Sequence, residues 1–311
     1  MKKALLIAGC ALLVVPWIGF IAVSAAVQLY CLDRCDAYPN RAPLVTSDFP
    51  VTEGLSQGLY RQAAERFGIP WEVLAAVGRV ECEHGLNPRC SSPNEAGAEG
   101  PMQFLPATFA RWSWASGSPD PSPYDPEDAV YAAAAKLAAD GVNGDPTRAL
   151  LSYNRSRVYV ADVVAWAVRY GWTPPDNVLY RESVLNHPRI GLRPAAAADV
   201  EAGRVDPRVL MALLMGATEH RLSHVGPFVS GHTYFVAGTD RPSNHAFGRA
   251  VDIPVVDGKP VSKSNKAAQR VVSLASGAEP DEIGSPWPDV KPGTHSFTKG
   301  HDDHLHFGWR P

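Results

Sequence analysis

The 311-residue chain lacks an excess of either charge, and proline and glycine are too few for a low-complexity polymer. Lysine and arginine number 29 against 32 aspartates and glutamates, which gives a formal net charge of −3. Without a basic excess, a dedicated nucleic-acid-binding protein is excluded. Hydrophobic residues make up 45% of the chain, enough apolar material for folded cores, so wholesale disorder is excluded as well. The length predicts two domains or one large one.

Charged side chains are also missing from residues 4–32, which follow Lys2 and Lys3. A membrane-spanning helix needs about 20 apolar residues, whereas the core of a signal peptide needs about 7–15. The uncharged run therefore predicts an amino-terminal transmembrane helix within residues 1–32. Because positive charges stay in the cytoplasm, the rest of the chain is expected on the outer side of the membrane.

Three other interpretations of this segment stay open. Weak cleavage-like sites within residues 22–26 would release a secreted protein. Residues 7–10 resemble a bacterial lipobox, although apolar sequence continues far beyond Cys10. A buried helix of a soluble fold is the third alternative. We predict a single-pass protein of the cell membrane with extracytoplasmic domains, and secretion after cleavage as the alternative.

The chain has few cysteines, and none of them has the CxxC…CxxC spacing of a zinc site. Cys31, Cys35, Cys82 and Cys90 follow the predicted anchor, and disulfides persist outside the cytoplasm. Four cysteines allow three pairings. Our first choice is the local pairing, Cys31 with Cys35 and Cys82 with Cys90, and free thiols are the alternative.

Proline and glycine clusters divide the rest of the chain. Residues 33–54 are rich in proline and are predicted to be a linker that leaves the membrane. Residues 55–172 have apolar residues at helical spacing. A second linker is predicted at 173–179. Residues 180–311 combine helical segments with short β-branched and aromatic runs, so they predict an α+β domain.

Local signals also predict where two helices begin or end. Apolar residues recur at every fourth position over residues 55–67, and Gly68 is suited to end that helix. Asp125 and Pro126 are expected to begin an alanine-rich helix, and Gly141 is expected to end it.

A candidate catalytic acid lies in the helical region. Glu81 ends an apolar helix and precedes a loop rich in glycine and proline. Next to apolar Val77 and Val80, its carboxyl loses hydration, which raises its pKa and suits a general acid near neutral pH. A solvated carboxylate at the end of a helix is the ordinary alternative.

The surroundings of Glu81 resemble a known family. The sequences at residues 87–88, 96–108 and 149–154 follow it in the order found in the lytic transglycosylase SLT domain, which cleaves the glycan strands of peptidoglycan. The resemblance covers residues 55–172 and implies an all-α, lysozyme-like fold. It implies that Glu81 is the only catalytic acid and base: it protonates the MurNAc–GlcNAc bond and then deprotonates the sugar's own C6 hydroxyl, giving a 1,6-anhydro product. No second carboxylate is then needed, unlike in paired-carboxylate glycosidases.

The same resemblance implies four substrate-binding residues, two on the cleft floor near the sugar and two that face the acid from a later helix: Met102, Gln103, Tyr153 and Asn154. One residue departs from the family pattern, because Cys82 stands where the family usually has serine. The alternative is a hydrolytic muramidase that uses Glu83 as a second carboxylate.

Histidines gather near the carboxyl terminus, with eight of the ten after residue 219. Imidazole is the commonest transition-metal ligand, so this clustering predicts a metal site. His245 and Asp252 are seven positions apart with the small residues Gly248 and Ala250 between them, and His304 and His306 point to the same face if they lie on a strand. His245, Asp252 and one of these two histidines would make three metal ligands. A fourth position would remain for water, which is the pattern of a catalytic zinc site.

This region also resembles a known family. Residues 243–252 match the signature SxHxxGxAxD without a mismatch, and residues 303–307 resemble a second motif. Both occur in the M15-like zinc peptidases, which include D-Ala-D-Ala carboxypeptidases and L-alanyl-D-glutamate endopeptidases. The resemblance covers residues 180–311 and implies a Hedgehog-like α+β fold.

The resemblance implies a zinc site with three ligands, a catalytic group and a substrate-binding residue. The implied zinc ligands are His245, Asp252 and His306. Asp303 takes the place of the family's catalytic carboxylate, which is more often glutamate. His304 is the alternative base or a stabiliser of the transition state, and Arg241 is a candidate for binding a substrate carboxylate.

Both resemblances point to one polymer. We predict a membrane-anchored, bifunctional peptidoglycan hydrolase that has Zn²⁺ in its second domain and no cofactor in its first. The alternative is a carboxy-terminal domain that binds zinc or the cell wall without turnover. The predicted partners are peptidoglycan and the membrane, with no nucleic acid. By analogy with actinobacterial wall-opening enzymes, secretion or conjugation machinery is a further candidate partner.

Overall fold

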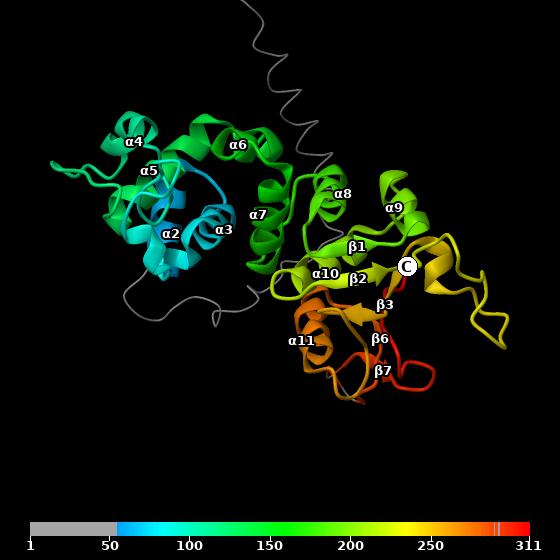
Figure 1. Cartoon of the computed structure of the whole chain (residues 1–311). Helices are drawn as coiled ribbons and strands as arrows, with labels where there is room; N and C mark the ends of the chain where they lie inside the picture. Colours follow the sequence, from blue (N-terminus) through cyan, green and yellow to red (C-terminus); the bar gives the residue numbers. More distant parts are fainter. Residues whose placement is uncertain (1–54, 289, 292) are drawn as a thin grey trace, which may run out of the picture. The chain divides into compact units, whose positions relative to one another are not determined.

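The computed structural model describes residues 55–288, 290–291 and 293–311 (Figure 1). The predicted anchor at 1–32 and the linker at 33–54 lie outside these residues, as do Cys31 and Cys35. Among the described residues, no helix has the length and apolar character needed to span a membrane.

The first part of the described chain, residues 55–172, is helical. Its α-helices are α2 (Gln57–Phe67), α3 (Trp71–Cys82), α4 (Pro106–Trp112), α5 (Pro126–Ala139), α6 (Pro146–Tyr153) and α7 (Arg157–Arg169). Short 3₁₀ turns lie at Glu83–Gly85, Pro88–Ser91 and Ser113–Ala115. The β pairing described in this part is an isolated bridge between Glu99 and Phe104, so the prediction of an all-α region is confirmed.

The predicted helix boundaries follow from local chemistry. Gly68 ends α2 in the left-handed conformation that glycine adopts without steric cost. The carboxylate of Asp125 accepts two backbone N–H groups at the start of α5, and Pro126 occupies its first turn. Gly141, two residues after α5, also has a positive φ. These signals were therefore sufficient to predict both boundaries.

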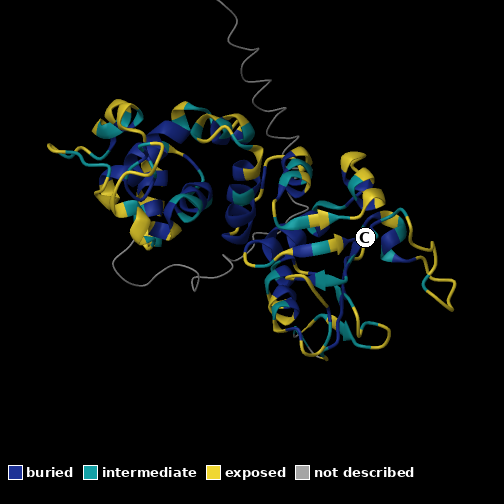
Figure 2. Ribbon diagram, viewed as in Figure 1, coloured by how far each residue is buried: buried dark blue, intermediate teal, exposed yellow. Residues whose placement is uncertain are grey.

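Helix α3 lies at the centre of this part. It is buried continuously from Val73 to Gly78 and packs against α7, α2 and α5. Gly78 is required where Tyr60 crosses the helix, since a Cβ there would lie 2.0 Å from the tyrosine hydroxyl. The central helix that carries Glu81 is thus held on several sides by packing, as the dark blue ribbon shows in Figure 2.

The second part combines helices with two four-stranded sheets, as the α+β prediction required. Its α-helices are α8 (Asn177–Asn186), α9 (Pro194–Glu201), α10 (Pro207–Ala217) and α11 (Lys266–Ala275). A 3₁₀ turn at Asn244–Phe247 follows the arm described below, and another lies at Ser276–Ala278. Helix α8 begins inside the predicted linker 173–179, because the Asp176 side chain accepts hydrogen bonds from two backbone N–H groups of its first turn.

The strands are β1 (Ile190–Leu192), β2 (Leu222–Val225), β3 (Ala250–Ile253), β4 (Val255–Val256), β5 (Lys259–Pro260), β6 (Glu282–Gly284), β7 (His295–Phe297) and β8 (Leu305–Gly308). One sheet has the order β1-β2-β4-β5 and the other β3-β8-β6-β7. In the second sheet, β3 and β8 are antiparallel and Asp252 lies directly opposite His306. The register therefore pairs two predicted zinc ligands that are far apart in the sequence.

Helix α10 is the core helix of this part. Every residue from Val209 to Ala217 is buried, because the helix packs against α7, α8 and α11. Its carboxyl end also meets α7 through a polar cluster, in which the nearly buried Arg169 donates to Thr218 and pairs with Glu219 at 2.7 Å. A second ion pair joins Arg189 to Asp162 of α7, also at 2.7 Å.

Candidate active sites

Glu81 lies in the last turn of α3, where the chain reverses sharply. Glu83 and His84, which follow it, both have positive φ values, a conformation that costs energy for residues other than glycine. The buried His84 ring stabilises this reversal through hydrogen bonds with the Tyr60 hydroxyl at 3.0 Å and the Tyr170 hydroxyl at 2.9 Å. Burial lowers the pKa of His84 to about 3, with a smaller contribution from the Arg79 charge, so the ring is neutral.

A disulfide fixes the same reversal from the other side. Cys82 is bonded to Cys90, with their Cα atoms 6.2 Å apart, so the predicted pairing of these two cysteines is confirmed. It joins the last residue of α3 to the 3₁₀ turn that follows the loop. Where the family usually has serine, this chain therefore has a covalent anchor next to Glu81. Glu83, the alternative second carboxylate, is exposed.

The environment of Glu81 raises its pKa. Burial raises it from the usual value to about 7, and an interaction with Tyr159 lowers it in part. The buried Tyr159 hydroxyl makes no hydrogen bond of good geometry with a described residue, and it lies near enough to the Glu81 carboxyl to lower the pKa of that group. Near neutral pH a substantial fraction of Glu81 is protonated, as predicted from its apolar neighbours.

The segment 99–104, which the resemblance places on the floor of the cleft, forms a tight turn. Glu99 and Phe104 exchange two backbone hydrogen bonds of 2.9 Å. Gly100 is required at the start of the turn, because a Cβ there would lie 1.7 Å from the carbonyl oxygen of Pro123. Gln103 has a positive φ and holds the turn, since its amide group donates to the Gly100 carbonyl at 2.7 Å and accepts from Asn94 at 3.1 Å.

Met102 differs from our expectation. Its side chain is fully buried in the core, and its carbonyl oxygen accepts a hydrogen bond of 2.9 Å from the Tyr153 hydroxyl. A side chain enclosed in this way cannot reach a sugar, so the expected direct contact is corrected to a packing role. The other predicted residue on the floor, Gln103, is partly exposed and remains a candidate for substrate binding.

Of the two predicted residues on the later helix, Tyr153 lies near Glu81 and Asn154 is exposed. Burial raises the pKa of Tyr153, and the charge of the nearby Glu81 carboxylate raises it further. Its ring stacks on Tyr159 with an interplanar angle of 8°. Asn154 is exposed in extended conformation at the end of α6. We missed Tyr159 because its position on α7 falls on the apolar face of that helix, where an aromatic residue is typical of a core.

The second site is built on the short 3₁₀ turn that carries His245. The Ser243 hydroxyl caps this turn by accepting the His245 N–H at 3.3 Å. Gly248 ends the turn in the left-handed conformation, and a Cβ there would lie 1.9 Å from the Arg204 carbonyl oxygen. The serine and glycine of the signature thus have local structural roles that place the histidine.

The three predicted zinc ligands converge. His245 Nε2 lies 3.4 Å from Asp252 Oδ1 and 3.4 Å from His306 Nδ1, and the last two atoms are 2.9 Å apart. In a tetrahedral zinc site with bonds of 2.0–2.1 Å, ligand atoms are about 3.4 Å apart. Two of the three distances match this value and the third is shorter, so the two nitrogens and the carboxylate oxygen lie close enough together to hold one Zn²⁺ ion and to leave one of four positions for another group.

Further hydrogen bonds orient the two histidines. The Nδ1–H of His245 donates to the Phe228 carbonyl at 3.0 Å, which leaves Nε2 for the metal. On the other ring, His306 Nε2 lies 3.3 Å from Glu282, a residue we did not predict. The Glu282 side chain passes over Gly308 on the neighbouring strand. A Cβ atom on residue 308 would lie 2.6 Å from the Glu282 carboxylate oxygen, so glycine leaves room for this side chain.

The charges of this cluster stabilise one another. The hydrogen bond with His306 lowers the pKa of Glu282 to about 2 against the effect of burial, and the nearby charge of Arg241 adds to this. Burial alone would raise the pKa of Asp252, but hydrogen bonds with His245 and His306 hold it well below its usual range. Arg241 itself is exposed, so it remains a candidate for binding a substrate carboxylate.

The predicted catalytic groups lie beside the ligands. His304 Nδ1 is 2.7 Å from the carboxylate of Asp303, and its Nε2 is 3.9 Å from Asp252. Asp303 is largely exposed, with 87% of its side chain accessible, so it reaches the cluster through His304. Both residues line an open pocket with Asp252, and Arg193, which we did not predict, lines it too.

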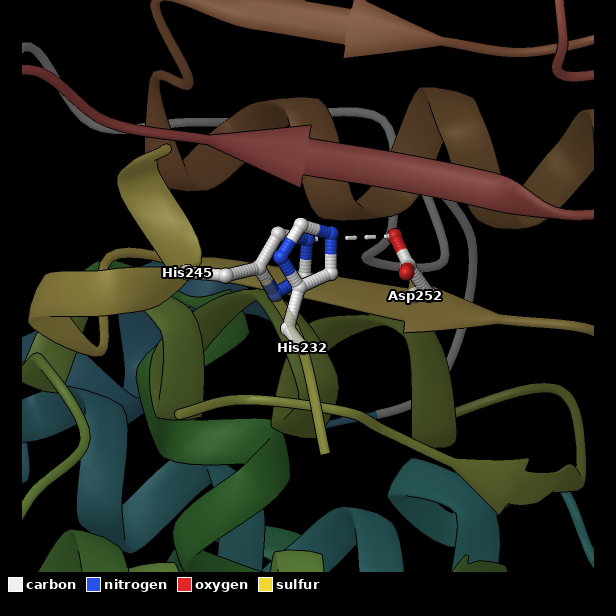
Figure 3. A group of neighbouring side chains, drawn as sticks. All are labelled: His232, His245 and Asp252. Carbon is white, nitrogen blue, oxygen red and sulfur yellow. Dashed lines mark ion pairs between the residues drawn. The ribbon is translucent and has the colours of Figure 1, made fainter. Parts of the chain in front are cut away.

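A fourth histidine, also not predicted, lies against the ligands. Figure 3 shows the ring of His232 on that of His245, with centroids 4.0 Å apart and an interplanar angle of 11°. One metal-binding atom each from His232, His245 and Asp252 lie within 4.8 Å of one another.

Comparison with known proteins supports the assignment of the helical part. Residues 58–166, about a third of the chain, match the family model of the transglycosylase SLT domain. No curated protein and no solved structure gave a significant match. The resemblance of residues 180–311 to zinc peptidases therefore rests on its sequence motifs and on the geometry of the site.

Proposed function

We propose that the helical part is a lytic transglycosylase that cleaves the MurNAc–GlcNAc bond of peptidoglycan. The observation that carries this proposal is the partly buried Glu81, with a pKa of about 7, in a region that matches the SLT domain. A carboxyl group with this pKa can give up a proton and take it back at neutral pH, which the reaction requires of a single residue.

In the proposed reaction, protonated Glu81 gives its proton to the glycosidic oxygen as the bond to the sugar's C1 breaks. The Glu81 carboxylate then removes the proton of the C6 hydroxyl, whose oxygen bonds to C1 and closes the 1,6-anhydro ring. Water is not consumed, and Glu81 ends protonated as it began. The nearby Tyr159 hydroxyl, which lowers the pKa of Glu81, would stabilise the carboxylate between the two steps.

The test uses the full-length protein in detergent micelles with purified peptidoglycan, and mass spectrometry of the products. Anhydro ends are expected from the wild type and from Glu83→Gln, a control at the neighbouring exposed carboxyl. Glu81→Gln should abolish them. Reducing ends from the wild type would instead indicate a hydrolytic muramidase, and unchanged products from Glu81→Gln would contradict the assignment of the acid.

We also propose that the carboxy-terminal part is a zinc peptidase that cleaves the peptide stem of the same polymer. The observation that supports this proposal is that the ligand atoms of His245, Asp252 and His306 lie 2.9–3.4 Å from one another, close enough to bind one zinc ion. When bound there, Zn²⁺ would polarise the peptide carbonyl and lower the pKa of water.

The arrangement of the neighbouring groups supports the alternative in which His304 transfers the proton. Its Nδ1 is held by Asp303, so its Nε2 is free to face the pocket next to Asp252. An imidazole oriented by a carboxylate is a common general base. Asp303, which we expected to be the base itself, would then orient His304 rather than touch the reacting atoms.

The test measures bound metal and peptide products in the same samples. The wild type should hold about one zinc per chain and release new peptide termini from cell walls, and His245→Ala should lose both. Zinc without new termini would indicate the alternative, a module that binds zinc or the wall without turnover. The exposed His224, changed to asparagine because its φ is positive, is a matched control.

We also propose that the protein is anchored in the cell membrane. A membrane anchor at 4–32 with both domains outside is supported by the sequence, and the Cys82–Cys90 disulfide suits an oxidising compartment. Protease treatment of intact spheroplasts should digest the described part of the chain. Secretion or conjugation machinery as a partner rests on analogy of domain layout.

A further inference from the structure

The segment 230–243 forms an exposed arm that ends at the metal-binding turn. Ser243 donates its N–H to the Tyr234 carbonyl at 2.8 Å, and Val236 donates to the Arg241 carbonyl at 2.9 Å, so the arm folds back on itself as an irregular hairpin. It is the yellow segment that projects from the second part in Figure 1, and most of its residues are exposed in Figure 2.

His232 lies at the start of this arm and its ring is prepared to bind a metal. Its Nδ1 forms a hydrogen bond of 2.8 Å with the Thr233 carbonyl, which places the ring proton on Nδ1 and leaves the lone pair of Nε2 free. His245 has the same arrangement, with its Nδ1–H bound to the Phe228 carbonyl. A histidine whose only role is to stack on His245 would not need a hydrogen bond that fixes the proton on Nδ1.

The distances bring His232 close to two of the three ligands. Its metal-binding atom lies within 4.8 Å of those of His245 and Asp252. Atoms bound to one zinc ion are at most about 4.2 Å apart, so a shift on the order of 1 Å would bring His232 into the coordination sphere. An exposed arm permits such a shift, because no packed core has to move with it.

We propose that His232 is a fourth protein ligand that closes the zinc site at rest, and that the arm withdraws it when substrate takes that position. This inference rests on the zinc site proposed above. Sites with four protein ligands are closed, whereas catalytic sites keep one position open. The arm therefore switches one site between these two states and protects it until the cell-wall substrate arrives.

The arm also has a surface that substrate can touch. Tyr234 is 55% exposed and Phe235 49%, and their rings meet edge to face. Tyr234 also contacts Phe247, which is 47% exposed and lies two residues after His245. Substrate that binds these rings more tightly in the open position would shift the arm toward it. The same contact links the arm to the ligand-bearing turn.

The experiment compares full-length wild type, His232→Ala and the control His224→Asn. Zinc affinity is measured by competition with a chromogenic chelator. After replacement of zinc by Co²⁺, visible absorption reports the coordination and its change when acetohydroxamate, a small metal-binding probe, is added. We expect His232→Ala to bind zinc about tenfold or more weakly and to bind the probe at least tenfold more tightly, while His224→Asn resembles the wild type.

The outcomes separate this inference from the proposed function. If the wild type binds zinc through His245 but His232→Ala has the same zinc affinity and the same probe affinity, His232 is not a ligand and only the present inference fails. If the wild type binds no more zinc than His245→Ala, the proposed metal site fails and this inference fails with it. Matching thermal unfolding of the three proteins excludes a folding defect.

Discussion

Buried carboxylates occur in both parts of the molecule, and burial has opposite outcomes in them. Glu81 of the helical part has apolar neighbours and one tyrosine hydroxyl, and its pKa rises to about 7. Glu282 of the second part is also partly buried, but its hydrogen bond with His306 lowers its pKa to about 2. The comparison shows that partners, rather than burial, decide whether a carboxylate serves as a proton donor or as a permanent charge.

The histidines repeat this difference. His84, near Glu81, forms hydrogen bonds with two hydroxyl groups, and burial lowers its pKa to about 3, so it remains neutral and structural. The hydrogen bonds of His306 with Asp252 and Glu282 outweigh its burial and raise its pKa to about 9. One site is therefore suited to moving a proton, whereas the other is suited to holding a cation.

The largest expected effect separates the two sites. Glu81→Gln should reduce glycan cleavage by about 10²–10⁴-fold, the range for loss of a general acid, and leave peptide cleavage unchanged. His245→Ala should have the reverse effect. Both activities are measured on one wall digest by mass spectrometry. Equal loss of both activities in either variant would contradict two independent sites.

The next effect concerns the charge that orients His306. Glu282→Gln removes the carboxylate but keeps a similar shape, and we expect zinc affinity to fall by about 10–100-fold, as for other partners of metal-bound histidines. The exposed Glu279, changed to glutamine, is the control. If chelator competition gives equal affinities for the two variants, the role of Glu282 as orienting partner is wrong.

A smaller effect tests the cost of burying Glu81. Between pH 4.5 and about 7 the folded protein holds a proton that the unfolded chain loses, so the free energy of unfolding falls as pH rises through this window. In Glu81→Gln the side chain does not ionise, so this fall in the free energy of unfolding disappears. At pH 8 it should be more stable than wild type by about 1–3 kcal/mol, and at pH 4 by almost nothing.

Urea unfolding at the two pH values provides the measurement. Glu83→Gln serves as the control, because its carboxyl is exposed. A gain in stability that is the same at both pH values would mean that ionisation of Glu81 is not its source.

The smallest effect concerns Tyr159. Glycan cleavage should decline as pH rises above about 7, because Glu81 must be protonated to act as the acid. Tyr159→Phe removes the interaction that lowers the Glu81 pKa, so this decline should move to higher pH. Initial rates between pH 5 and pH 9 test it, with Tyr124→Phe, at an exposed tyrosine, as the control. A shift to lower pH would contradict the assigned interaction.

Much of the fold could be predicted because its signals are local. The ends of α2 and α5 follow from glycine, proline and capping carboxylates that act within one turn. The Cys82–Cys90 disulfide joins residues only eight positions apart. The expectation for Met102 was wrong because a motif identifies a segment but does not show which of its side chains are buried in the core.

The residues we missed share a different property. Tyr159 reaches Glu81 from another helix, Glu282 reaches His306 from another strand, and His232 lies against His245 through the fold of an exposed arm. Each partner is 13 to 78 positions away in the chain. Pattern and spacing carry no information on such pairs, since several registers and packings satisfy the same hydrophobic periodicity.

The sequence by itself determined the chemical groups available: one acid at the end of an apolar helix, and histidines and an aspartate at a metal-binding spacing. Only the tertiary structure decided their states. The register of β3 and β8 set Asp252 opposite His306, and the packing around α3 buried Glu81 with no cationic partner among the described residues. Desolvation and charge act through space over a few ångströms, so their outcome depends on neighbours that only folding brings together.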